Sequence, residues 1–253
     1  MTDYADIARG RVSYTCRAGW IDWGHADGSG AANLIAMVAA GRHAPGVPAS
    51  LDVRLGGGPA AVINYRQTMG GTVPVVGVRV DLPAGPKYWI VRRNLSRPTA
   101  VSVALGIFMA ESLRFESWQR WAWGMATDSG QSAEDLVSNL IGFYRAANGV
   151  DRQRIGRLLG EVSTAESQRI WKDHLGDGGL GALKNDRFEP IYFPSTECGP
   201  DAGRLPREVE QMRPSAEGLH WVRPRYQGGR FWDLPWRRNA TFHFSSGGSL
   251  RVD

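Results

Sequence analysis

The chain has 253 residues, of which 42% are hydrophobic and 22% are charged, and these proportions exclude a disordered or fibrous protein. The length allows one large domain or two small ones, either with a substantial core. The net charge of +5 favours polyanionic partners such as nucleic acid, anionic lipid or an acidic envelope polymer, although the basic residues are scattered and solubility alone can explain them.

The segment 16–27 reads CRAGWIDWGHAD and places ionisable side chains among glycines and tryptophans. If the chain is helical from Ile21 onward, Asp22 and His25 lie one turn apart on the same helix face. A carboxylate at that spacing can orient an imidazole, which suits a general base or a metal ligand. The alternative is a capped helix start, in which Asp22 binds free backbone amides and His25 is half-buried.

A short helix and a block of strands are predicted next. The apolar run 33–40 stops at Gly41, which predicts a helix end there. Four strands are then predicted at 51–55, 62–66, 76–81 and 88–91. The glycine-rich turns between them favour an antiparallel meander, because none has the spaced glycines, lysine and hydroxyl residue of a phosphate-binding loop.

From Pro98 to Trp123 the apolar period changes to that of a helix. Glu111 falls in line with the aromatic residues of this helix, which are Phe108, Phe115 and Trp118. A carboxylate on an apolar face is desolvated, which raises its pKa and lets it act as a general acid near neutral pH. The alternative is an arginine partner at the edge of the core.

A second carboxylate on the same helix, Glu116, points about 140° away from Glu111 around an ideal helix. The two cannot converge from one straight helix, so only one of them is expected to meet His25.

The next helix is predicted from Ser132, which with Asp135 forms a capping box, to a left-handed end at Gly149. Asn139 shares the inward side of this helix with its apolar residues and needs partners there. Charged amphipathic helices at 152–159 and 164–175 follow, and the remainder is rich in glycine, proline and arginine.

These elements predict an α+β fold. We expect three to five helices packed against a small antiparallel sheet, in a single domain over residues 1–253. Residues 177–253 are expected to form a loop-rich C-terminal extension that packs on this core.

The two cysteines, Cys16 and Cys198, permit one long-range disulfide or two thiols. The first residues contain no conventional signal peptide, and no apolar stretch approaches the roughly 20 residues of a membrane-spanning helix. The sequence therefore predicts synthesis in the cytoplasm without a transmembrane segment, and it leaves open export to the periplasm or to a target cell.

Two further sets of side chains suggest binding. No cofactor is certain, but a divalent metal ion could be held by a subset of the scattered acidic and histidine residues, which are Asp22, His25, Asp27, Glu111, Glu116, His220 and His243. Zinc motifs with paired histidines or Cys-x-x-Cys are lacking. Among ten tryptophans, the predicted substrate contacts are Trp20, Trp23 and Trp118, together with Asn139, with core packing as the alternative.

Three segments together resemble a bacterial lipoprotein family defined only as domain of unknown function 4056. They are YTCRAGWIDWGH at 14–25, ESW at 116–118 and SAEDLVSNLIG at 132–142. The resemblance implies an envelope setting and no established reaction, and it favours Asp22, His25, Glu116, Asp135 and Asn139 as a cluster. Family members usually have an arginine and an aspartate after the histidine, whereas Ala26-Asp27-Gly28 follows here.

Three functions are consistent with these observations. The first is a hydrolase of an envelope polymer, above all peptidoglycan, in which a glutamate is the acid or a metal ligand and His25, oriented by Asp22, is the base. A delivered antibacterial effector of this kind would have a cognate inhibitor protein as partner. The second is a non-catalytic module that binds an envelope glycan or an anionic polymer. The third is a nuclease, which the charge favours and the lack of a nucleic-acid-binding motif opposes.

Overall fold

The computed structural model describes residues 2–65 apart from 48 and 56, 71–72, 79–80, 87–123, 134–214 apart from 184 and 186, 222–225, 242–244 and 250–252. The side chains of 71–72, 79–80, 87, 113–123 and of every residue from 215 onward lie outside this description. The chain divides into two compact units, Met1–Ala32 with Glu116–Arg213, and Asn33–Phe115 with Pro214–Asp253. The prediction of a single domain over 1–253 stays a prediction.

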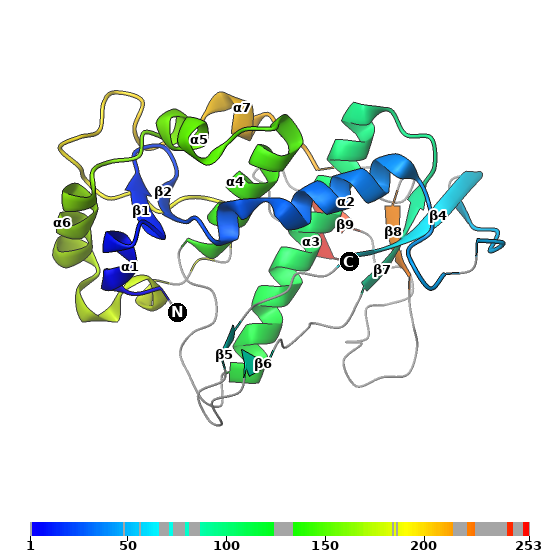
Figure 1. Ribbon diagram of the computed structural model, residues 1–253, viewed down its shortest axis with the longest axis horizontal. Coiled ribbons are helices and arrows are strands. Elements are labelled where there is room, and N and C mark those ends of the chain that lie inside the picture. The colour runs from blue at the N-terminus through cyan, green and yellow to red at the C-terminus, as the bar shows by residue number, and fades with distance from the viewer. Residues whose placement is uncertain are drawn as a thin grey trace. The chain divides into compact units, whose positions relative to one another are not determined.

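The first unit combines a β-hairpin with short helices (Figure 1). Its elements are α1 (Tyr4–Ala8), β1 (Val12–Thr15), β2 (Gly19–Asp22), the 3-10 helix η1 (His25–Asp27), α4 (Asp135–Asn148), α5 (Arg152–Leu159), α6 (Thr164–His174), the 3-10 helices η2 (Gly176–Gly178) and η3 (Leu180–Ala182), and α7 (Arg207–Glu210). The predicted left-handed end of α4 at Gly149 is confirmed by its φ of 62°. Ser132 lies outside the described residues.

The hairpin overturns one expectation. The chain is not helical from Ile21, because β2 continues through Asp22 and pairs with β1 in antiparallel register, with Val12 opposite Asp22. The helical turn begins only at His25. All four residues of β2 are buried, and a short strand buried on both faces cannot be told from a helical segment by periodicity alone.

The core of the first unit is built from aromatic side chains of the hairpin and α6. Trp20 packs edge-on against Trp171, with ring centroids 5.5 Å apart, and Tyr14 packs edge-on against Trp20 at 5.6 Å. Ile170 is fully buried in the same cluster. Burial of this aromatic surface is what holds α6 to the hairpin.

The segment after η3 packs onto the first unit through several independent contacts. Cys16 and Cys198 form a disulfide that links the end of β1 to this segment. The buried carboxylate of Glu166 on α6 accepts hydrogen bonds from Ser195 Oγ at 2.6 Å and Thr196 N at 2.9 Å. These contacts hold the segment that contains residues 195–198 to β1 and α6, while the packing of the whole region 177–253 on the core stays a prediction.

The second unit contains an antiparallel sheet and most of two helices. The sheet has the order β3 (Arg54–Leu55), β4 (Gly58–Tyr65), β7 (Lys87–Arg92), β8 (Val222–Arg225). Two further antiparallel pairs are β5 (Gly71–Thr72) with β6 (Arg79–Val80), and β9 (Phe242–Phe244) with β10 (Leu250–Val252). The helices α2 (Ser29–Ala40) and α3 (Arg97–Trp123) begin or end in the first unit.

The α+β class is confirmed, as are the helices predicted to end at Gly41 and to span 98–123. The predicted strand at 51–55 is shorter, since only Arg54–Leu55 pairs with β4. No helix in the described part of the chain is long and apolar enough to cross a bilayer.

Candidate functional site

The candidate site lies in the first unit, where η1 packs against α4. His25 opens η1, and its Nδ1 lies 3.0 Å from Oδ1 of Asp135, the first residue of α4. The imidazole is 31% exposed, whereas Asp135 is largely buried. A ring that is open to solvent on one side and fixed by a carboxylate on the other is the arrangement used by catalytic histidines.

The acidic surroundings decide the charge of His25. Burial lowers the pKa of the imidazole, but the 3.0 Å contact with the Asp135 carboxylate and the negative charges of Asp135, Asp22 and Glu134 outweigh burial and raise this pKa to about 9. The imidazole is therefore protonated at neutral pH. It can donate a proton or stabilise negative charge there, but it cannot act as a base until the pH approaches 9.

The structure corrects the predicted role of Asp22. Its Oδ1 accepts a hydrogen bond from Gly24 N at 2.8 Å, and its Oδ2 lies 3.0 Å from the Arg11 guanidinium. Its backbone N–H donates to Ser138 Oγ on α4 at 2.9 Å. Asp22 thus fixes the turn that carries His25 and contributes charge at a distance, while Asp135 orients the imidazole. The predicted pairing failed because β2 replaces the expected helix.

A third carboxylate, Glu134, directly precedes α4 and is only 1% exposed. Its Oε1 accepts a hydrogen bond from Thr2 Oγ1 at 2.7 Å, and no described residue donates to its buried Oε2. Burial, reinforced by the charge of Asp135, raises the pKa of Glu134 to about 7, although the Thr2 hydroxyl and His25 oppose this shift. Glu134 therefore exchanges a proton in the neutral range.

Two glycines allow η1 and α4 to approach closely. Gly28 ends η1 with a φ of +79°, and a Cβ at this residue would lie 2.5 Å from the carbonyl oxygen of Gly142. A Cβ on Gly142 would lie 3.0 Å from the carbonyl oxygen of His25. Arg145 on α4 donates a further hydrogen bond to the carbonyl oxygen of Ala26. The position of His25 thus depends on backbone contact as well as on its ion pair.

The two predicted glutamates, Glu111 and Glu116, are not among the described residues of this site. Glu111 is buried in the second unit, where its Oε1 accepts a hydrogen bond from Trp89 Nε1 at 3.1 Å. The side chain of Glu116 lies outside the described residues. The acid expected on α3 is therefore still a prediction, and the carboxylates that the structure places around His25 are those of Asp135, Glu134 and Asp22.

The predicted substrate contacts also need revision. Trp20 is 3% exposed in the aromatic core, and Trp23 is buried with its Nε1 donating to Ser13 Oγ at 2.8 Å and the Arg152 guanidinium 3.3 Å from its ring centroid. Neither offers an open face for stacking, so both act as core residues. Asn139 is half-buried rather than inward, and the Trp118 side chain lies outside the described residues.

Metal binding finds no support among the described side chains. No group of three or more His, Cys, Asp or Glu residues in this part of the chain is arranged to hold an ion. Asp27 is exposed and accepts a hydrogen bond from Ser29 N, while the side chains of Glu116, His220 and His243 lie outside the described residues. Cys16 is in a disulfide and is therefore not a free nucleophile.

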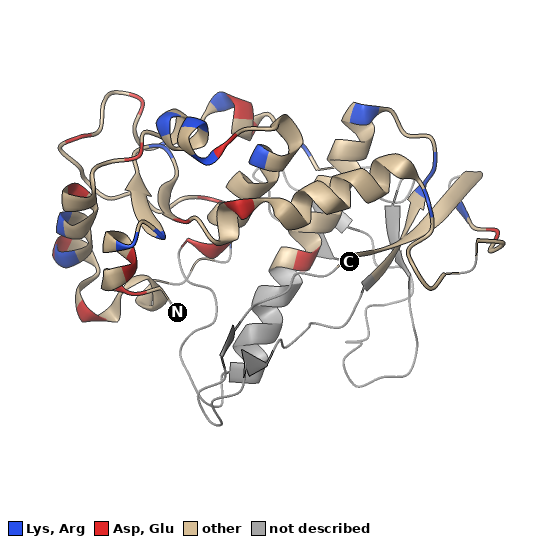
Figure 2. Ribbon diagram, in the orientation of Figure 1, with Lys and Arg blue, Asp and Glu red and all other residues tan. Residues whose placement is uncertain are grey.

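Charge on the first unit is mixed. Figure 2 shows acidic and basic residues interspersed on α6 and α7. A nucleic-acid-binding face would concentrate Lys and Arg on one side of an element. The mixed pattern of α6 and α7 gives no support to the nuclease hypothesis, whereas α5 carries Arg152, Arg154 and Arg157 and no acidic residue, so charge alone does not decide this hypothesis.

Comparison with known proteins gives no further guidance, since no protein-family model, curated protein or solved structure matches this chain. The likeness to the lipoprotein family therefore stays a prediction. Sequence reasoning reached Asp135 only through that likeness and missed Glu134. The available signal was the Glu-Asp pair at the start of a helix, where such residues are usually interpreted as solvated partners of the helix dipole.

Proposed function

We propose that this chain is a hydrolase of a cell-envelope polymer, with peptidoglycan as its substrate, and that His25 and Glu134 are its proton-transfer groups. The observation that carries the proposal is the half-exposed imidazole held at 3.0 Å by Asp135, beside a buried glutamate whose Oε2 has no donor among the described residues. Paired titratable groups whose surroundings separate their pKa values are typical of acid–base sites.

The charges assign roles opposite to those expected from the sequence. Between pH 7 and 9, Glu134 is mostly ionised and His25 is mostly protonated. Because Glu134 is only 1% exposed, it receives the proton of the attacking water through an intervening water molecule as the oxygen of the attacking water bonds to the scissile carbon. His25 gives its proton to the departing group as the bond to that group breaks. Asp135 holds the ring, and solvent then returns the proton from Glu134 to His25.

The disulfide supports the envelope setting. Disulfides persist in oxidising compartments such as the periplasm and the cell surface, and they are rare in the cytosol. The Cys16–Cys198 bond is therefore consistent with a protein that acts outside the cytoplasm, as an exported enzyme or as a delivered effector.

The proposal is tested by incubating the purified, oxidised protein with peptidoglycan sacculi and measuring the soluble fragments by chromatography and mass spectrometry. His25→Gln and Glu134→Gln should each reduce release by about 10²- to 10⁴-fold, the usual effect of removing an acid or a base. Asp173→Asn is the matched control, because it removes an exposed acid of the same unit that pairs with Arg169. Absence of release by the wild-type protein, or equal release by all variants, would contradict the proposal.

A non-catalytic binding module is the second candidate, and the burial of the acidic cluster favours it. Asp22, Glu134 and Asp135 are all buried, and the cluster joins η1 to α4 as a structural lock would. In this case His25→Gln lowers the melting temperature and leaves binding to sacculi unchanged. A variant that folds and binds but has lost turnover would exclude the module.

A further inference from the structure

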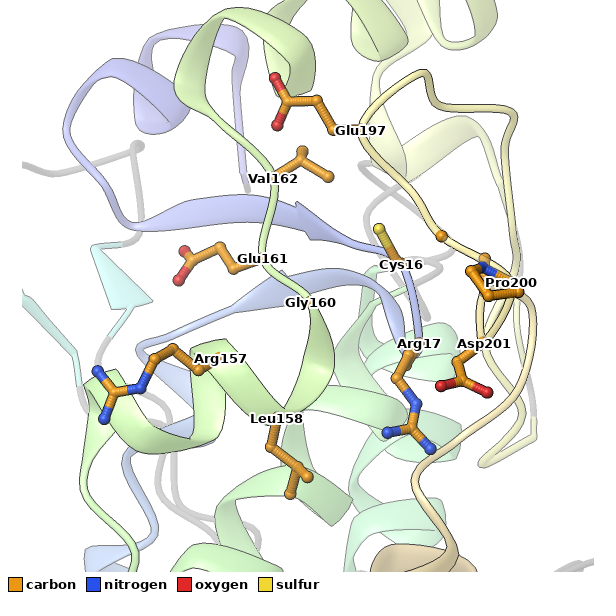
Figure 3. A pocket seen from close by; sticks show the side chains of 12 residues that line it. Cys16, Arg17, Arg157, Leu158, Gly160, Glu161, Val162, Glu197, Pro200 and Asp201 are labelled. Carbon is orange, nitrogen blue, oxygen red and sulfur yellow. The ribbon is translucent and has the colours of Figure 1, made fainter.

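A cavity of about 340 Å³ lies beside the disulfide in the first unit (Figure 3). Its wall is formed by three segments, which are the turn after β1, residues 157–162 at the end of α5, and residues 197–202. The volume falls within the range of small-molecule sites and exceeds the space needed for one or two waters.

The three carboxylates of this wall already have donors. Glu161 accepts hydrogen bonds from Arg152 at 2.7 Å and from Ser13 Oγ at 2.6 Å, and Glu197 accepts one from Ser163 N at 2.7 Å. The exposed Asp201 pairs with Arg204 at 3.1 Å. The acidic groups of the wall are thus compensated within the protein.

Of the two arginines of the wall, Arg17 and Arg157, Arg17 is the one with a buried donor. The Nε atom of Arg17 is buried, and no described residue accepts a hydrogen bond from it. The backbone at Arg17 is fixed, since its N–H donates to Leu159 O at 3.0 Å and its carbonyl accepts from Tyr192 Oη at 3.1 Å. A buried donor without an acceptor costs free energy, and a guanidinium offers the planar pair of donors that suits an oxyanion.

Arg157, the second arginine of the wall, lies apart from Arg17. In Figure 3, Arg157 and Glu161 extend to one side of the Gly160 segment, while Arg17 and Asp201 extend on the other side. Arg157 is also exposed to solvent. The anion-binding capacity of the cavity therefore rests on Arg17.

We infer that this cavity is a binding site for a small ligand with an oxyanion group, a carboxylate or a phosphate, which accepts hydrogen bonds from the Arg17 guanidinium. The cavity shares no lining residue with the site around His25, and ligand binding in it does not depend on the proposed hydrolase activity. Its chemistry suits the carboxylates of peptides and the phosphates of envelope polymers equally, so the test must distinguish these sources.

The test follows the Arg17 Nε–Hε resonance by NMR while inorganic phosphate or N-acetylglycine is added to the oxidised protein. Saturable movement with one probe identifies that group as the ligand chemistry, and movement with both supports a general oxyanion site. In parallel, Arg17→Lys keeps the charge but removes the planar donor pair, and calorimetry should then show binding weakened about tenfold or more. Arg157→Lys is the matched control and should bind like the wild type.

Two results would overturn the inference. One is an Arg17 resonance that neither probe moves, which would assign the buried donor to a water molecule. The other is equal binding by wild type and Arg17→Lys. The resonance is measured on the wild-type protein, so the test stands even where a variant fails to fold.

Discussion

His25 Nδ1 and Asp135 Oδ1 lie 3.0 Å apart, and this contact joins the 3-10 helix η1 to the first turn of α4. It sets the charge of the imidazole, since the same carboxylate that orients the ring also raises its pKa. The chemistry proposed for the site follows from this one relationship.

The first prediction concerns that ion pair. Asp135→Asn removes the paired charge while burial remains, so the pKa of His25 should fall from about 9 toward its ordinary value of 6.5, with the charges of Asp22 and Glu134 still opposing the effect of burial. The measurement is an NMR titration of the imidazole carbons. Asp27→Asn, which removes an exposed acid of the same 3-10 helix, should leave the titration near that of the wild type. An unchanged pKa in Asp135→Asn would show that Asp135 does not set the charge.

The second prediction is the pH dependence of stability. His25 and Glu134 both have raised pKa values in the folded protein, so the folded state holds more protons than the unfolded state. The His25 contribution is full below pH 6.5 and is lost as the pH rises through about 9. The Glu134 contribution is full below pH 4.5 and is lost as the pH rises through about 7. Thermal unfolding should therefore show a falling melting temperature from pH 5 to pH 10.

The variant Glu134→Gln separates the contribution of Glu134 to the pH dependence of stability from the contribution of His25. The amide cannot ionise, so the decline between pH 4.5 and 7 should become shallower and the variant should be more stable than the wild type at pH 8. The decline between pH 6.5 and 9 should persist, because it belongs to His25. A melting temperature that rises with pH in the wild type would contradict both assignments.

The longer helices of this protein can be predicted from the sequence because their signals are local, whereas the short helices α1 and α7 were not predicted. Apolar periodicity and a glycine end located α3 and α4, and the charged faces of α5 and α6 gave their spans. The segment at Ile21 was misread because a four-residue apolar strand and one helical turn have similar patterns. Pairing with β1 decides between them, and that contact is not visible in the segment itself.

The site could be predicted only in part for a related reason. His25 was identified from its unusual neighbourhood, but its partner Asp135 lies far along the chain, and no spacing rule connects them. Trp20 and Trp23 were expected to bind substrate, yet burial decides their role, and burial depends on α6 and Arg152. The pKa of Glu134 likewise arises from tertiary burial rather than from sequence.

The third prediction tests the close approach of η1 and α4. Gly142→Ala places a Cβ 3.0 Å from His25 O and 3.1 Å from Ala26 Cα, so the backbones must separate by tenths of an ångström. We expect a loss of about 1–3 kcal/mol in the free energy of unfolding, partly offset by the better helix propensity of alanine. The pKa of His25 should fall as its distance from Asp135 increases. Gly181→Ala, where a Cβ meets open space, is the control for denaturant unfolding and for the NMR titration.

The fourth prediction concerns the disulfide, which closes a loop across a sequence separation of 182 residues. Chain entropy assigns a loop of this length about 5 kcal/mol of stabilisation, and measured losses for native disulfides are about 2–5 kcal/mol. Cys198→Ser should therefore lower the unfolding midpoint in urea, and dithiothreitol should lower it equally in the wild type. The native fold should survive at neutral pH without denaturant, because Glu166 still binds Ser195 and Thr196. Dithiothreitol should have no further effect on Cys198→Ser, and a midpoint identical in oxidised and reduced wild type would refute the linkage.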